Sequence, residues 1–192
     1  MNKRFFAILV TCFIACWICA CGSKGPIIKS LQVGTIDGPE TQLMEVAQKV
    51  AKEKYHVNFE IVTFSDYSLP NVALHDFSID ANMFQHKPYL EEFNKAHGFQ
   101  LEAVAKTFVY PMGIYSTKHT SLKKIQQQAI IAIPNDPSNE ARALLLLQKA
   151  NLITLKPDIT TNATIIDILS NPKDLVFKEL DAAELPRLIQ DV

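Results

Sequence analysis

The chain has 192 residues, which is enough for one domain or for two small lobes after an N-terminal targeting segment. Its formal net charge of −1 gives no extended positive field, and this argues against nucleic acid as a partner. Apolar residues make up 48% of the sequence, a share that suits a globular fold.

The N-terminus has the pattern of a bacterial lipoprotein signal. Two basic residues precede the uncharged stretch 5–20, and the small residue Ala20 stands directly before Cys21. This stretch of 16 residues is shorter than the ~20 that a membrane-spanning helix needs. We therefore predict a signal peptide over 1–20, acylation of Cys21, and a tether over 21–29 that holds the protein at a membrane surface. An uncleaved membrane anchor is the alternative.

Cysteine chemistry is not expected in the mature domain. All four cysteines lie at or before position 21, so cleavage removes three of them and acylation occupies the fourth. The sequence thus predicts a domain without disulfides, thiolate metal ligands or a cysteine nucleophile.

Beyond the tether, strand-like and helix-like segments alternate, which predicts an α/β fold with mainly parallel sheets. The predicted strands are 31–33, 59–63, 79–84, 129–133 and 175–180. A β-rich run is also predicted over 101–116, with a break at 111–113. One predicted helix begins at Pro39, after a loop over 34–38. The other predicted helices are 69–75, 88–97, 137–147, 164–169 and 182–189. Asp136 is expected to cap the helix that begins at Pro137.

Three segments that follow predicted strands carry candidate binding residues. Residues 64–67 and 80–89 fall at carboxyl ends of strands, where open α/β sheets place ligands, and the second segment offers aromatic and imidazole rings for a small amphipathic ligand. In the third segment, which opens the helix at 137, Asn139 and Arg142 share a face, and Arg142 can bind a carboxylate through two bonds. The alternatives are that Phe84 and Tyr89 belong to the core and His86 is a surface histidine with satisfied hydrogen bonds. For the third segment, the alternative is a capped helix with a solvated arginine.

Several segments resemble the NlpA-type lipoproteins, which are methionine-binding proteins of ABC importers. The matching segments are 38–40 (GPE), 63–67 (TFSDY), 79–90 (IDANMFQHKPYL), 107–111 (TFVYP), 133–139 (IPNDPSN), 144–149 (LLLLQK) and 184–187 (ELPR). The resemblance runs from about Leu31 to the end of the chain.

This resemblance implies a fold of the periplasmic-binding-protein type, in which crossing strands join two α/β lobes. Lobe 1 would cover 30–112 and lobe 2 would cover 113–192. Because family members continue beyond the position that matches Val192, the second lobe and the return crossing would be incomplete. The implied partners are methionine or a related amino acid, the permease and ATPase subunits of an importer, and the lipid bilayer at the extracytoplasmic face of the cell membrane. No cofactor is implied.

The resemblance also assigns roles to individual side chains. Those implied to surround the thioether group of the ligand are Tyr67, Phe84, His86 and Tyr89. Arg142 would hold the ligand carboxylate, with Asn139 nearby.

Two other classes of function compete with ligand delivery. One is a vestigial or structural lipoprotein that stays on the membrane and binds nothing. The other is a metal-binding lipoprotein, suggested by His56, His75, His86, His97 and His119, although these histidines lack short paired spacing. Enzyme activity is not expected, because no Ser/His/Asp set, phosphate loop or paired-carboxylate motif stands out.

Overall fold

The computed structural model of the protein describes residues 30–159 and 161–192, so the predicted signal peptide, Cys21 and the tether lie outside the described residues. The strands are β1 (Leu31–Ile36), β2 (Phe59–Phe64), β3 (Ala81–Asn82), β4 (Ile130–Pro134), β5 (Thr154–Leu155), β6 (Ile168–Ser170) and β7 (Val176–Leu180). The α-helices are α2 (Pro39–Tyr55), α3 (Leu69–His75), α4 (Lys87–His97) and α5 (Pro137–Lys149). Short 3₁₀ helices cover Leu122–Lys124, Ile165–Asp167 and Leu185–Leu188.

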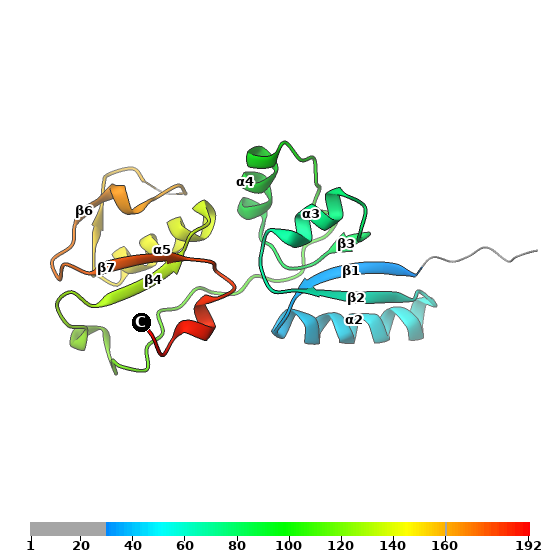
Figure 1. Ribbon diagram of the computed structural model, residues 1–192, viewed down its shortest axis with the longest axis horizontal. Coiled ribbons are helices and arrows are strands. Elements are labelled where there is room, and N and C mark those ends of the chain that lie inside the picture. The colour runs from blue at the N-terminus through cyan, green and yellow to red at the C-terminus, as the bar shows by residue number, and fades with distance from the viewer. Residues whose placement is uncertain (1–29, 160) are drawn as a thin grey trace, which may run out of the picture. The chain divides into compact units, whose positions relative to one another are not determined.

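The first sheet consists of three parallel strands in the order β2-β1-β3, with Leu31 opposite Phe59 at the start of the β1–β2 pair. Figure 1 shows α2 along one face of this sheet and α3 on the other. Helix α2 begins at Pro39, where the missing N–H of proline costs nothing. It ends where His56 takes the left-handed conformation, with φ 56°. The parallel pairing predicted for this part of the chain is confirmed.

Helix α4 places a row of rings on one face, because Tyr89, Phe93 and His97 are four residues apart. The ring centroids lie 5.9 Å apart for Tyr89 and Phe93 and 4.2 Å apart for Phe93 and His97. Tyr89 and Phe93 are buried. Gly98 ends the helix with φ 69°, a conformation that a residue without a Cβ adopts at little cost.

A second sheet pairs β4 with β7 in parallel, and α5 packs against β4. The carboxylate of Asp136 accepts a hydrogen bond from the backbone N–H of Asn139 at 3.0 Å, which confirms the predicted helix cap. Ile133 of β4 and the leucines Leu144 and Leu147 of α5 are buried in one hydrophobic core. The remaining pair, β5 with β6, is antiparallel.

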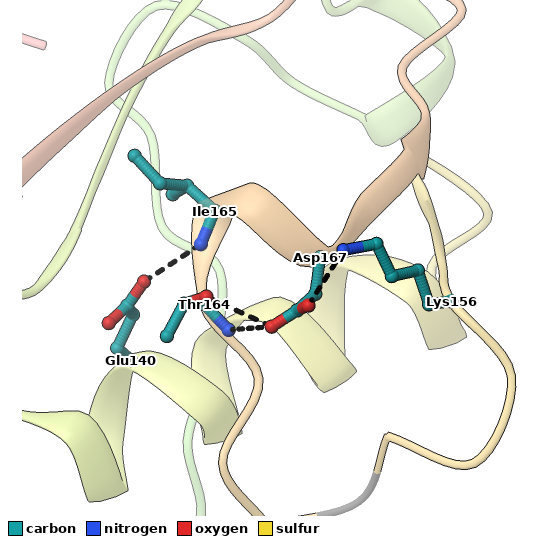
Figure 2. A network of polar contacts seen from close by, with 5 residues as sticks. All are labelled: Glu140, Lys156, Thr164, Ile165 and Asp167. Carbon is teal, nitrogen blue, oxygen red and sulfur yellow. Dashed lines mark hydrogen bonds and ion pairs between the residues drawn. The ribbon is translucent and has the colours of Figure 1, made fainter.

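A polar network joins α5 to the segment before β6 (Figure 2). The buried carboxylate of Glu140 accepts a hydrogen bond from the backbone N–H of Ile165 at 3.0 Å. Asp167 accepts bonds from the backbone N–H and the hydroxyl of Thr164, at 3.1 and 2.9 Å, and from Lys156 at 3.2 Å. Burial raises the pKa of Glu140, whereas the bonds from Thr164 lower the pKa of Asp167. These hydrogen bonds hold the segment 164–167, which precedes β6, against the first turn of α5.

Two predicted boundaries in the first sheet differ from the structure. The strand predicted at 31–33 continues to Ile36, because β2 offers a pairing partner along its whole length, so only the end of 34–38 is a loop. The strand predicted over 79–84 is limited to Ala81–Asn82, because β1 pairs with it at two positions only.

Two helices predicted near the C-terminus are wrong in type. Within 164–169, a single 3₁₀ turn closed by the capping box of Thr164 and Asp167 is followed at once by β6, which pairs with β5. Within 182–189, only Leu185–Leu188 is helical, and it is a 3₁₀ helix.

The largest difference concerns the β-rich run 101–116, which contains no strand. Its residues favour extended structure, but a strand needs a partner, and no strand among the described residues pairs with this run. The residues of 102–110 are exposed, and Val104 is 96% exposed, whereas Met112 and Ile114 pack against the hydrophobic core.

Residues 31–192 group into one compact unit. The strands before position 112 form the first sheet and those after it form the other two pairs, while the lobe boundary at 112/113 remains a prediction. No helix within 30–159 and 161–192 is long and apolar enough to cross a membrane.

Candidate ligand-binding site

Four predicted side chains come together beside the first sheet and are called here the aromatic cluster: Tyr67, Phe84, His86 and Tyr89. Tyr67 follows β2, Phe84 and His86 follow β3, and Tyr89 lies in the first turns of α4. The ring centroids of Tyr67 and Phe84 are 5.8 Å apart, those of Phe84 and Tyr89 are 5.9 Å apart, and those of Tyr67 and Tyr89 are 6.0 Å apart. The edge-to-face and tilted arrangements are those that aromatic pairs prefer.

Tyr89 forms the buried base of this cluster, and Tyr67 is only half-buried. The Tyr89 side chain is 8% exposed, and its hydroxyl donates a hydrogen bond to the backbone carbonyl of Tyr67 at 2.9 Å. Burial raises the pKa of both phenols, and nearby carboxylates, among them Asp136 and Asp181, raise these pKa values further. Both rings therefore stay uncharged and offer apolar faces.

His86 adds a polar atom to the cluster. Its Nε2 is buried and has no hydrogen-bond partner among the described residues. Burial lowers the pKa of His86, and the positive charge of Arg142 lowers it further, against a smaller opposing effect of Asp136. The imidazole is therefore neutral at pH 7, with one nitrogen available to a bound group.

Arg142 is held by its neighbours at the start of α5. Its Nη1 donates a hydrogen bond to Oδ1 of Asn139 at 2.9 Å, and its Nη2 donates one to the carbonyl of Tyr110 at 3.1 Å. The amide nitrogen of Asn139 in turn donates to both carboxylate oxygens of Asp136, each at 3.0 Å. Asn139 is buried, and in this arrangement it orients Arg142.

The structure brings the two predicted groups of residues near each other. Helices α4 and α5 are in contact, and the charge of Arg142 is among the causes that lower the pKa of His86. The half-buried side chain of Arg142 thus lies close enough to His86 and Tyr67 for its charge to act on both pKa values, adding to the effect of burial at His86 and opposing it at Tyr67. Such an arrangement suits a small ligand with a carboxylate at one end and an apolar group at the other.

An amide network behind the aromatic cluster escaped sequence reasoning. The side chain of Asn71, fully buried in α3, donates to Oε1 of Gln85 at 2.9 Å and accepts from Nε2 of Gln85 at 2.6 Å and from Nδ2 of Asn82 at 3.0 Å. The network fixes the residues on either side of Phe84 to α3. The signal in the sequence was an asparagine among the apolar residues of 69–74.

Replacing Asn71 by alanine is expected to lower the free energy of unfolding by about 1–3 kcal/mol, because the amides of Asn82 and Gln85 lose a buried partner. Urea unfolding followed by circular dichroism measures this change. Asn162→Ala, at an exposed position, is the control and should change little. Equal stability of the two variants would show that the network contributes nothing.

Other features of the surface do not coincide with this site. A hollow of about 310 Å³ is lined by Leu74, His75, Phe77, Gly98, Gln100 and Leu101, none of which belongs to the predicted site. Two histidines, His75 and His97, lie against Phe99, with ring centroids 3.8 and 5.6 Å from it. Within the described ranges, no three His, Cys, Asp or Glu side chains gather as a metal site would require.

Solved structures place this fold in the class of periplasmic substrate-binding proteins. An ABC transporter periplasmic substrate-binding protein from Coxiella burnetii is 59% identical, with a TM-score of 0.80 over 84% of this chain and 68% of that chain. A nutrient-binding protein from Burkholderia cenocepacia bound to methionine is 49% identical, with a TM-score of 0.81 and the same coverage of both chains. The predicted fold class is confirmed.

The family model described as NlpA lipoprotein matches residues 31–192, and the chain belongs to this family. A curated relative, the probable D-methionine-binding lipoprotein MetQ of Vibrio cholerae, is 50% identical over 175 residues. The match covers 91% of this chain and 65% of the relative. The chain therefore spans less than two thirds of the length of that relative.

Proposed function

We propose that the protein is a substrate-binding lipoprotein that binds methionine or a related amino acid for an ABC importer. The observation that carries this proposal is the contact between α4, which carries Tyr89, and α5, which carries Arg142, with the two close enough for the charge of Arg142 to lower the pKa of His86 further. In this proposal the cluster packs around the thioether group and Arg142 binds the carboxylate, while Asn139 orients Arg142. The role is binding and delivery to permease and ATPase subunits, not catalysis.

The aromatic half of the site is tested by replacing Phe84 or Tyr67 with alanine. Each change is expected to weaken methionine binding by about 1–3 kcal/mol, or about tenfold to a hundredfold, because it removes packing against the thioether group. Tyr89→Ala should act in the same direction, with an added loss of stability because its hydroxyl is hydrogen-bonded.

These affinities are measured by calorimetry on a fusion protein. In this fusion, the chain is joined to the longest segment of the Vibrio cholerae relative that lies outside the matched residues. Phe77→Ala is the control, because Phe77 is 87% exposed and lies outside the cluster. Unchanged affinity in all three cluster variants would assign these rings to the core or the surface and overturn the proposed pocket.

We also propose that the protein is anchored to the extracytoplasmic face of the cell membrane through acylated Cys21. Mass spectrometry of the protein from bacterial membranes should find a lipid-modified Cys21 as the first residue. Cys21→Ala should leave an uncut signal or release the domain, whereas Cys19→Ala should keep the modification. Unmodified protein that begins at Met1 in wild-type bacteria would contradict the anchor.

A second candidate function is that of a lipoprotein that binds no ligand. It is favoured by the exposed run 102–110, which leaves apolar side chains such as Val104 and Val109 uncovered. Methionine binding by the chain itself separates the two functions.

A further inference from the structure

The segment 82–85 carries Phe84 from the first sheet into the aromatic cluster, and its backbone is bonded to β1 just before this ring. The backbone N–H of Met83 donates a hydrogen bond to the carbonyl of Gly34 at 2.8 Å. The carbonyl of Met83 accepts one from the hydroxyl of Thr35, a fully buried residue, at 3.3 Å. The first sheet therefore fixes the path of the chain up to Phe84.

The side chains on either side of Met83 and Phe84 are tied to α3. The amide nitrogen of Asn82 donates to the backbone carbonyl of Pro70 at 3.1 Å and to Oδ1 of Asn71 at 3.0 Å. The amide nitrogen of Gln85 donates to Oδ1 of Asn71 at 2.6 Å and to Oδ1 of Asn82 at 3.3 Å. Asn71 thus uses both ends of its buried amide on this one segment, since its nitrogen also donates to Oε1 of Gln85 at 2.9 Å.

The ring of Phe84 has no polar atom that could fix its own position. Phe84 lies between β3 and α4, outside any helix or strand, and it is only half-buried. Its neighbours in the cluster contact it through ring packing, with centroids 5.8 Å away at Tyr67 and 5.9 Å away at Tyr89. Such ring pairs are worth only about 0.5–1.5 kcal/mol each. The position of the ring therefore depends on the hydrogen bonds of the residues around it.

We propose that Asn71 is a positioning residue of the binding site, which acts through Asn82 and Gln85 to hold the Phe84 ring where the apolar side chain of the ligand packs. A ring that is already in place loses less freedom when the ligand binds, and the affinity is higher for this reason. The proposal rests on the proposed function for the nature of the ligand, whereas the effect of Asn71 on the ring is a property of the chain alone.

The first experiment observes the ring without any ligand. Nuclear Overhauser effects between the ring protons of Phe84 and Tyr67 are recorded on the full chain and on two variants, Asn71→Ala and Gln85→Met. Both variants should lose these effects, because each removes hydrogen bonds that hold the segment 82–85. Gln85→Met does so while the side chain keeps nearly the same length.

Asn94→Ala is the matched control. Asn94 is also a half-buried amide that joins two segments, because its side chain donates to the carbonyl of Leu101 at 2.8 Å and accepts from the N–H of Leu101 at 3.2 Å. This variant should keep the contact between Phe84 and Tyr67. Slow amide exchange in β1 and β2 shows which variants are folded, and Gln85→Met decides the result if Asn71→Ala does not fold.

The second experiment measures methionine affinity by calorimetry on the fusion protein, for Asn71→Ala, Phe84→Ala and the variant with both changes. Asn71→Ala alone should weaken binding about tenfold. In the Phe84→Ala background the same change should weaken binding less than about threefold, because no ring remains to be positioned. A residue that served stability alone would not show this dependence on Phe84.

Three results would overturn the proposal. The contact between Phe84 and Tyr67 persists in the folded network variants, or Asn94→Ala loses it as well, or Asn71→Ala costs the same affinity with and without the Phe84 ring. Methionine is absent from the first experiment, so a failure of positioning is distinguishable from a failure of the proposed ligand binding.

Discussion

Replacing Arg142 by alanine is expected to cost about 2–5 kcal/mol of methionine binding, through loss of the charged partner for the ligand carboxylate in a partly desolvated site. The guanidinium is already oriented by Asn139 and by the carbonyl of Tyr110, so little ordering is needed when the ligand binds. The affinity is measured by calorimetry on the same fusion of the chain with the unmatched segment of the Vibrio cholerae relative.

Two further variants make the Arg142 result specific. Arg142→Lys should recover little, because an ammonium group cannot form the planar two-bond contact. Arg187→Ala is the control, since Arg187 pairs with Glu184 on the surface and its side chain is 53% exposed. Full methionine affinity in the lysine variant would contradict a two-bond contact with the carboxylate.

The chain by itself is expected to bind methionine no more tightly than about the millimolar range, which corresponds to ~4 kcal/mol. Residues 102–110 are exposed, so less apolar surface is buried to offset the entropy cost of ordering the site. We expect a marginal thermal transition and a tendency to aggregate.

Thermal melts with and without methionine, followed by calorimetry, test this expectation. The joined chain described for the Arg142 variants is the comparison, and it should bind substantially more tightly. A cooperative melt of the chain alone that micromolar methionine raises strongly would contradict the prediction, and would also remove the case for a lipoprotein without a ligand.

Helices whose ends are set by a proline or a capping side chain could be predicted from the sequence. The helix predicted over 69–75 is α3, and the predicted cap at Asp136 is present, because caps and prolines act on their own turn. The run 101–116 was predicted as β-rich from propensity alone, and propensity cannot supply the partner strand that pairing requires.

The candidate site was accessible to sequence analysis mainly through the family resemblance. Residue patterns alone could not decide whether Phe84 and Arg142 bind a ligand or have an ordinary structural role. The segments that carry them are brought close together only by the fold. Asn71 could not be predicted, because its role depends on contacts with Asn82 and Gln85, which are more than ten positions away along the chain. Such contacts leave no periodic pattern in the sequence.

The bonds that run from Asp136 through Asn139 to Arg142 also limit how this part of the protein can change over generations. One carboxylate both begins α5 and, through a single amide, holds the guanidinium in place. A replacement at Asp136 therefore removes a helix cap and loosens the side chain of Arg142 in the same step, and no single change at Arg142 restores the cap. The aromatic cluster is spread over three segments, and neither Phe84 nor the Tyr67 ring caps a helix, so a replacement of either ring leaves the start of α5 intact.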